Sequence, residues 1–223
     1  MRANAGFSRI VIFASGKGTG FERLLEDRAA GRLPVEIAAL ACNVASAGAV
    51  EIAHAHNVPV ALVEHQGLRR EEHELKLLAA VKDACGVDLK TEGWVVLAGY
   101  MRLFSPQFME LLADSALGVV RAVNIHPSLL PAFPGVDAYD QAWNHGVKVV
   151  GCTVHLLSSA VDDGPIVAQA PLVLRDDETL ESLRARGHAL EHEVYGATIA
   201  RLARGGWKLE KTVGGARQRV VFP

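Results

Sequence analysis

The sequence is poor in cysteine, in net charge and in long apolar runs. Only three of its 223 residues are cysteines, Cys42, Cys85 and Cys152, and they are too far apart for a disulfide framework or a zinc-ligand pattern. No apolar run approaches the length of a membrane span, and residues 1–8 lack the apolar core of a signal peptide. We therefore expect a cytoplasmic protein in a reducing compartment, with no membrane partner.

Positive and negative charges nearly cancel along the chain. Lys and Arg total 23 against 25 Asp and Glu, so the net charge of -2 gives no overall attraction for nucleic acid. Hydrophobic residues make up 50% of the chain and charged residues 22%, as in ordinary globular proteins. A chain of this length can bury a sizeable core, and no repeat or linker divides it. We expect one domain over residues 1–223.

Short apolar runs alternate with helical patterns through the first half of the chain. The runs predict strands at 9–14, 35–43, 58–63, 94–98 and 119–126. Helices are predicted from about residue 21, over 48–56, over 69–85, and after Ser105, which suits an N-cap followed by Pro106. This alternation predicts an α/β protein with an open, doubly wound, mostly parallel sheet.

The second half of the chain has a different pattern. Residues 147–157 and 165–170 have strand composition and flank a short loop, so we expect an antiparallel hairpin rather than another β-α-β unit. A long helix is predicted from Asp177 to about Arg204, and residues 207–223 are expected to form a short tail. The predicted inward stripe of that helix, at spacings of three and four, is Leu180, Leu183, Gly187, Leu190, Val194 and Ala197.

Polar residues close the strand that ends near residue 126. Asn124 and His126 are two apart, so they point to the same face of a strand. Pro127 keeps His126 extended, and Pro131 stiffens the loop that follows. Ligands of open α/β sheets bind beyond the carboxyl ends of the strands. The pair therefore suggests a functional site, and a hydrogen-bonded histidine at an ordinary strand end is the alternative.

A glycine loop, residues 15–20, joins the first strand to the first helix. Glycines let backbone N–H groups approach an anion, and a helix N-terminus adds its partial positive charge, so the loop suits a phosphate group. Its glycines, at 16, 18 and 20, match neither the dinucleotide fingerprint nor the Walker fingerprint. A phosphate cradle is therefore the hypothesis, with a plain tight turn as the alternative.

Two motifs in this order carry a family resemblance: Asn124-x-His126-Pro127-Ser128-Leu129-Leu130-Pro131, and Asp162-x-Gly164-Pro165-Ile166. With them the chain resembles the 10-formyltetrahydrofolate-dependent formyltransferases, over residues 9–207. The resemblance implies their Rossmann-like fold and 10-formyltetrahydrofolate as the formyl-donating co-substrate, with no metal. The length favours the branch that formylates the amine of glycinamide ribonucleotide in purine biosynthesis, because related branches carry an extra domain for which this chain has no room.

The resemblance also implies roles for individual positions. Asn124, His126 and Asp162 match the family's catalytic residues. Glu191 matches an acidic residue that contacts the ribonucleotide. The loop that holds the ribonucleotide phosphate is matched by Gly18, Thr19 and Gly20, beside which Lys17 adds positive charge. Two parts of the family's folate site are also matched. Arg70 matches a basic residue near the glutamate tail of the folate, and the segment that lines the pterin pocket is matched by Met101, Arg102, Leu103 and Phe104.

These residue types also suit the chemistry directly. When an amine attacks a formamide carbonyl, an Asn amide and a protonated His near the oxygen stabilise the negative charge that develops there. A nearby carboxylate favours the charged imidazole, and through a water it passes a proton from the attacking amine to the departing folate nitrogen. No covalent intermediate is needed.

Some positions depart from the family pattern, and rival functions stay open. Gly20 stands where an asparagine is usual, Asp137 and Tyr139 where histidines are common, and Asp163 where a glycine is common. The loop at 158–161 is neutral rather than acidic. The rivals are a hydrolase that releases formate from the folate, a transferase for another sugar-nucleotide amine, and a non-catalytic nucleotide-binding module.

Several histidines allow more than one interpretation. His188, Glu191 and His192 match a short zinc-peptidase pattern, but a catalytic zinc needs a third protein ligand nearby. His155 is either a supporting residue of the site or a satisfied core histidine. The remaining histidines outside the motifs are expected at the surface: His54, His56, His65, His73 and His145.

Overall fold

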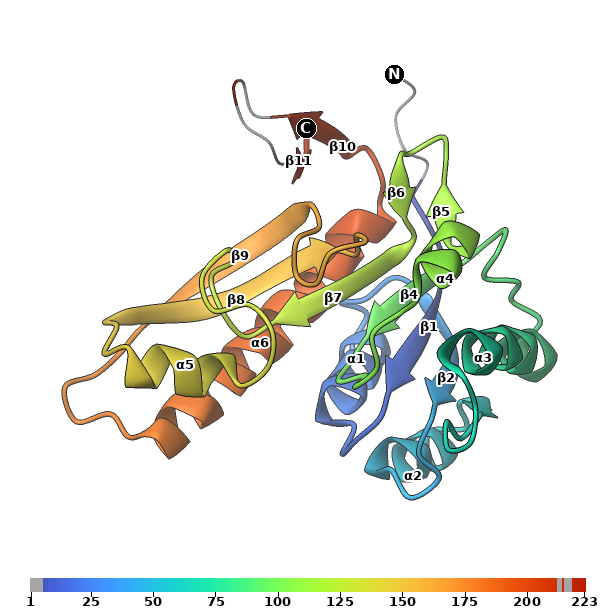
Figure 1. Ribbon diagram of the computed structural model, residues 1–223, viewed down its shortest axis with the longest axis horizontal. Coiled ribbons are helices and arrows are strands. Elements are labelled where there is room, and N and C mark those ends of the chain that lie inside the picture. The colour runs from blue at the N-terminus through green and yellow to red at the C-terminus, as the bar shows by residue number, and fades with distance from the viewer. Residues whose placement is uncertain (1–5, 212–213, 215–217) are drawn as a thin grey trace.

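A computed structural model describes residues 6–211, 214 and 218–223. Its first half alternates strand and helix as predicted (Figure 1). The elements are β1 (Arg9–Ala14), α1 (Thr19–Ala29), β2 (Glu36–Cys42), α2 (Gly48–Ala55), β3 (Val60–Leu62), α3 (Arg70–Cys85), β4 (Trp94–Leu97) and α4 (Pro106–Leu111). The strands β1, β2, β3 and β4 pair in parallel, and β4 pairs in parallel with β7 (Ala122–His126).

The second half adds antiparallel strands to the same sheet. Its other elements are β5 (Ala113–Asp114), β6 (Val119–Val120), α5 (Ala138–Asn144), β8 (Val149–Leu156), β9 (Ile166–Val173), α6 (Leu180–Ala203), β10 (Lys208–Lys211) and β11 (Gln218–Val221). Strand β8 pairs antiparallel with β7 and with β9, so the predicted hairpin is confirmed. Among the described residues the main sheet has nine strands, in the order β10-β11-β9-β8-β7-β4-β1-β2-β3. The mostly parallel, doubly wound α/β fold is also confirmed.

Alternate residues of the central strands pack into two core layers. In β1, Ile10 and Ile12 join an apolar cluster with α1, α2 and α6, while Val11 and Phe13 join a second cluster with α3 and α4. Successive side chains of a strand point to opposite faces. A sheet covered by helices on both faces therefore needs continuous apolar strands, which is why β1 has no polar residue between Ile10 and Ala14.

Three predictions about short segments were wrong or incomplete. Residues after 207 are not a simple tail, because β10 and β11 pair with each other and β11 extends the sheet beside β9. Val119 and Val120 belong to the separate β5–β6 ribbon, because the buried Arg121 interrupts the run and donates to backbone carbonyls of Leu89 and Gly93. Helix α5, which follows the loop after β7, was not predicted.

The inward face of α6 was predicted correctly only in its first half. Leu183 and Gly187 are buried, but Ala197 is exposed. The C-terminal half instead buries Tyr195, Ile199 and their neighbours, because α6 packs against β8 and β9 on one side and against α1 on another. A helix buried on two sides does not show the single apolar stripe on which the prediction relied. Among the described helices, none is both long and apolar enough to cross a membrane.

His73 is buried, although the sequence predicts a surface position for it. It lies on the inward side of α3 and is 0% exposed, and its Nε2 donates to the Val63 carbonyl oxygen at 2.8 Å. Its Nδ1 has no hydrogen-bond partner among the described residues. Burial lowers the pKa of His73 below its ordinary value of 6.5, so the folded protein disfavours the imidazolium.

We expect this histidine to make the fold sensitive to acid. As the pH falls below about 6.5, the unfolded chain binds a proton that folded His73 resists, so the free energy of unfolding decreases. The variant His73→Gln keeps a donor for Val63 but does not titrate. In urea unfolding at about pH 7.5 and about pH 5.5, it should lose less stability than the wild type on acidification. The exposed His54→Gln is the matched control, and an equal loss in the His73 variant would contradict the prediction.

Candidate active site

The glycine loop lies between the end of β1 and the first turn of α1. Gly18 precedes the helix with a left-handed φ of 83°, and a Cβ there would come within 2.7 Å of the Ala49 Cα. Only glycine satisfies both conditions. In the described part of the chain no side chain caps α1 by hydrogen bonding. The N–H groups of its first turn are therefore free to bind an anion.

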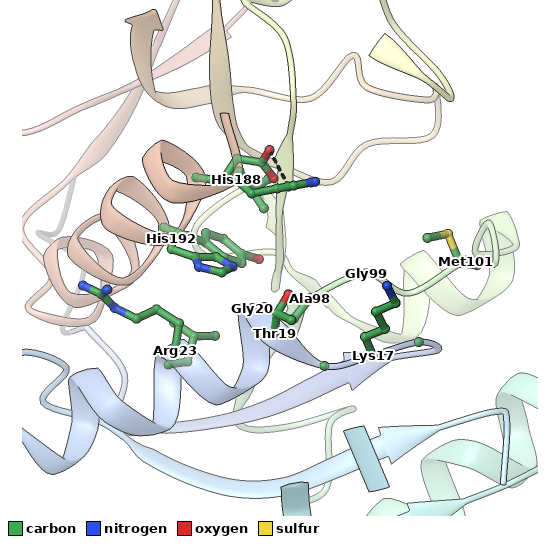
Figure 2. Close-up of a pocket in the computed structure, with 15 residues that line it drawn as sticks. Lys17, Thr19, Gly20, Arg23, Ala98, Gly99, Met101, His188 and His192 are labelled. Carbon is green, nitrogen blue, oxygen red and sulfur yellow. Dashed lines mark ion pairs between the residues drawn. The ribbon is translucent and has the colours of Figure 1, made fainter. Parts of the chain in front are cut away.

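A first cavity lies between this loop and α6 (Figure 2). Residues 17–20 line one side of the cavity, and Glu191 lines the α6 side. Figure 2 shows His188 and His192 on α6, across the cavity from Arg23 on α1. The structure therefore brings the whole predicted phosphate loop and the predicted acidic residue into one cavity.

The first cavity also contains basic residues to which the sequence gave no binding role. Arg23 lies one helical turn after Thr19 and Gly20, which puts it on the same side of α1. With Lys17 it gives the lining a second cationic side chain, whose Nε also donates to Asp27 Oδ1 at 3.1 Å. The sequence did carry a signal for Arg23, because it lies four residues after Thr19 and residues four apart share a helix face. Two cations and an uncapped helix end suit an anionic ligand.

A second cavity lies on the other face of β7. Asn124 lines the second cavity and its neighbour Ile125 lines the first, as expected for successive residues of a strand. Four of the five predicted folate-binding residues line the second cavity: Arg70, Arg102, Leu103 and Phe104. Met101 is 81% exposed and lines the first cavity instead, because its backbone N–H donates to the Ser15 hydroxyl beside the glycine loop.

Asn124, His126 and Asp162 come together at the carboxyl end of β7. Asp162 Oδ2 lies 3.4 Å from His126 Nδ1 and accepts a hydrogen bond from the Gly135 backbone N–H at 2.8 Å. Asn124 Nδ2 lies 3.4 Å from His155 Nε2, which is 3.7 Å from Asp162 Oδ1. Asp162 has a left-handed φ of 52°, which aspartate tolerates better than most residues. The Asp162 carboxylate thus lies close to His126 of β7, to His155 of β8 and to the loop that contains Gly135.

His126 has a partner at each ring nitrogen. It is 4% exposed, its Nε2 donates to the Phe133 carbonyl oxygen at 2.8 Å, and its Nδ1 faces Asp162. Both partners are hydrogen-bond acceptors, so each ring nitrogen faces an oxygen. Asn124 and Asp162 line the second cavity, whereas His126 lies beneath them. Asn124 is therefore placed to donate directly to a ligand, and His126 to hold Asp162.

His155 is buried and hydrogen-bonded, and it also lies beside Asn124 and Asp162, which favours the supporting role over that of a core histidine alone. The antiparallel pairing of β7 and β8 sets His155 opposite Asn124, and the imidazole lines the second cavity. Burial lowers the pKa of His155, which favours its neutral form. Neutral His155 can accept a hydrogen bond from the Asn124 amide. A sequence pattern that shows a hairpin but not its register gives no signal for this contact.

The short zinc-peptidase pattern forms an ion pair rather than a metal cluster. His188 Nδ1 lies 3.3 Å from Glu191 Oε1, as the dashed line in Figure 2 marks. Within residues 6–211, 214 and 218–223, no three His, Cys, Asp or Glu side chains are grouped so that they could hold a metal ion. The pattern at 188–192 is therefore explained by the first cavity.

Two cavities on opposite faces of β7, the second of them lined by Asn124, His155 and Asp162, suit an enzyme that joins two substrates. The comparison with known families agrees, because the model of the formyl transferase family matches residues 8–199. The chain belongs to the formyl transferase family.

Three individual relatives show which members of the family the chain resembles. A phosphoribosylglycinamide formyltransferase of Bacillus subtilis is 35% identical over 196 residues, which cover 87% of this chain and 94% of the relative. The crystal structure of glycinamide ribonucleotide transformylase 1 from Symbiobacterium toebii has a TM-score of 0.82 at 36% identity, covering 97% of this chain and 94% of that one. A formyltetrahydrofolate deformylase of Escherichia coli is 33% identical over 195 residues, but the match covers only 65% of its length.

Proposed function

We propose that this protein transfers a formyl group from 10-formyltetrahydrofolate to the amine of glycinamide ribonucleotide, in purine biosynthesis. The observation that carries the proposal is the pair of cavities on opposite faces of β7. One has a phosphate loop and an acidic residue, the other has two arginines and apolar walls, and Asn124 and Ile125 separate them. The names of the transferase relatives support glycinamide ribonucleotide as the acceptor of a formyl group, and the name of the deformylase relative supports a formyltetrahydrofolate.

Each cavity fits one substrate. In the first, residues 17–20 bind the ribonucleotide phosphate with backbone N–H groups and the Lys17 ammonium, and Glu191 accepts a hydrogen bond from the rest of the molecule. In the second, Leu103 and Phe104 contact the pterin, and Arg70 lies where the glutamate tail leaves the pocket. Binding both substrates side by side supplies much of the rate enhancement, because the reacting atoms are already oriented.

The chemical step uses the group at the end of β7. The amine nitrogen attacks the formyl carbon, a C–N bond forms, and the carbonyl oxygen becomes negatively charged. The Asn124 amide donates to this oxygen, and the His126 imidazolium stabilises its charge. Asp162 takes a proton from the amine through a water and returns it to the folate nitrogen, whose bond to the formyl carbon then breaks. No step requires a metal.

The assay that tests the function is deformylation of 10-formyltetrahydrofolate, followed by absorbance, with and without glycinamide ribonucleotide. His126→Ala serves as the blank. Turnover that requires the ribonucleotide is the expected result. Turnover without it would make the protein a hydrolase, the activity named for the deformylase relative, and no turnover in either case would overturn the proposal.

Lys17→Ala tests the phosphate site. The variant should raise the KM for glycinamide ribonucleotide about tenfold, since a hydrogen bond to a charged group is lost. The kcat and the KM for the folate should change little, because Lys17 lies on the first cavity only. Steady-state kinetics with each substrate varied in turn measure both values. The control is Lys90→Ala, because Lys90 is an exposed lysine that lines neither cavity. An unchanged ribonucleotide KM would remove Lys17 from the phosphate site.

We further propose that residues 1–223 act as one domain and that the protein is cytoplasmic. The family match over residues 8–199 supports the first point, as does the joining of β11 to the sheet. The free thiols of Cys42, Cys85 and Cys152 support the second.

A further inference from the structure

Tyr139 contacts a residue of the first cavity without lining the cavity itself. Its hydroxyl donates to Glu191 Oε1 at 2.6 Å, which joins α5 to α6 across 52 positions of the sequence. The ring is 5% exposed and packs in a small apolar cluster with Val150 and Leu183. Glu191 lines the cavity and Tyr139 does not. Tyr139 can therefore affect a bound ligand through Glu191, and its ring also lies edge-on to that of His188, a second residue of the cavity.

Gly187 makes room for this contact. A Cβ at this position of α6 would lie 2.1 Å from the Tyr139 hydroxyl oxygen and 2.3 Å from the adjoining ring carbon. Glycine within a helix lowers its stability relative to alanine. The tyrosine and the glycine therefore form a matched pair: the large ring reaches Glu191 only because α6 has no side chain at the position where the ring crosses it.

The hydroxyl of Tyr139 stays protonated and so remains a hydrogen-bond donor. Burial, together with the neighbouring Glu191 carboxylate, raises the pKa of Tyr139 well above its ordinary value, so the proton stays on the oxygen. His188 Nδ1 lies 3.3 Å from the same Oε1, and its hydrogen bond to Glu191 raises the pKa of His188. Both neighbours thus contact Oε1. Within the described part of the chain no hydrogen bond or ion pair involves the other carboxylate oxygen, Oε2, so Oε2 is the oxygen left for a ligand.

We propose that Tyr139 is a positioning residue for the ribonucleotide, which it serves by fixing the Glu191 carboxylate so that Oε2 accepts a hydrogen bond from the substrate. The inference rests on the proposed function. A carboxylate on a long side chain loses rotamer freedom when it binds a ligand. Tyr139 holds one carboxylate oxygen before the ligand binds, so Glu191 has already lost this rotamer freedom in the free enzyme. Binding then costs less entropy, and the affinity for the ribonucleotide is higher.

The test is a double-mutant cycle with Tyr139→Phe and Glu191→Ala, read by calorimetric binding of glycinamide ribonucleotide. Tyr139→Phe should weaken binding about tenfold, and raise the KM for the ribonucleotide without changing the KM for the folate or kcat. In the Glu191→Ala background the same change should have no further effect, because the carboxylate is absent. Gly187→Ala, which displaces the ring, should resemble Tyr139→Phe.

The outcomes separate this inference from the function on which it rests. If Glu191→Ala weakens binding and Tyr139→Phe does not, Tyr139 has no positioning role and the function is unaffected. If Tyr139→Phe weakens binding equally with and without Glu191, its effect is structural and the inference is overturned. If Glu191→Ala itself leaves the affinity unchanged, the role of Glu191 in the proposed function is wrong as well.

Discussion

Asp162→Asn is expected to lower kcat about a thousandfold, the size of a lost general acid–base group. The amide has the same shape as the carboxylate, and asparagine also tolerates the left-handed φ of 52° at this position. The loop should therefore keep its conformation. What is lost is the ability to take a proton from the amine, together with the negative charge that lies beside His126. Both KM values should change little.

The neighbouring residue provides a matched control for this prediction. Asp163→Asn makes the same chemical change one position further along the loop, and should keep kcat within about threefold of the wild type. Stopped-flow turnover at saturating concentrations of both substrates measures kcat, and far-UV circular dichroism checks the fold. A full rate in Asp162→Asn would remove the carboxylate from the proton transfer. Equal losses in both variants would mean that the total charge of the loop matters rather than Asp162.

The sequence predicted the parts of the site that lie on one continuous element. Asn124 and His126 are two residues apart at a strand end, so period-two geometry alone placed them on one face. The glycine loop was likewise visible as strand, loop and helix. Asp162 was different, since it came from the resemblance to a family. Nothing in its local sequence shows that the loop after β8 folds back to the end of β7.

The residues whose roles the sequence left open or did not show depend on contacts between distant elements. His155 enters the site through the register of β7 and β8, and Tyr139 reaches Glu191 because α5 packs on α6 beside a glycine. His73 was assigned to the surface because charged residues surround it in the sequence, yet it falls on the inward side of α3. In each case packing between elements decided the outcome, and local pattern carries little of that information.

Asn124→Ala is expected to lower kcat by a factor of about 100 to 1,000, the usual cost of removing one donor to a developing oxyanion. Asn124 lines the second cavity beside Asp162, and its amide nitrogen carries two hydrogens, so it can donate to the carbonyl oxygen as well as to His155 Nε2. Because the oxygen becomes charged only in the transition state, the KM for the folate should stay near the wild-type value.

His126→Ala tests how the amide and the imidazole divide this work. In the proposed mechanism His126 helps to stabilise the oxyanion, and its Nδ1 also contacts Asp162. The single variant should lose at least as much kcat as Asn124→Ala. If the two residues stabilise the same oxygen, the double variant should lose much less than the product of the two single losses, since residues that act as a unit are not additive. Losses that multiply fully would show that His126 and Asn124 act on separate steps, and the imidazole would then belong with Asp162 in the proton transfer rather than with the oxyanion.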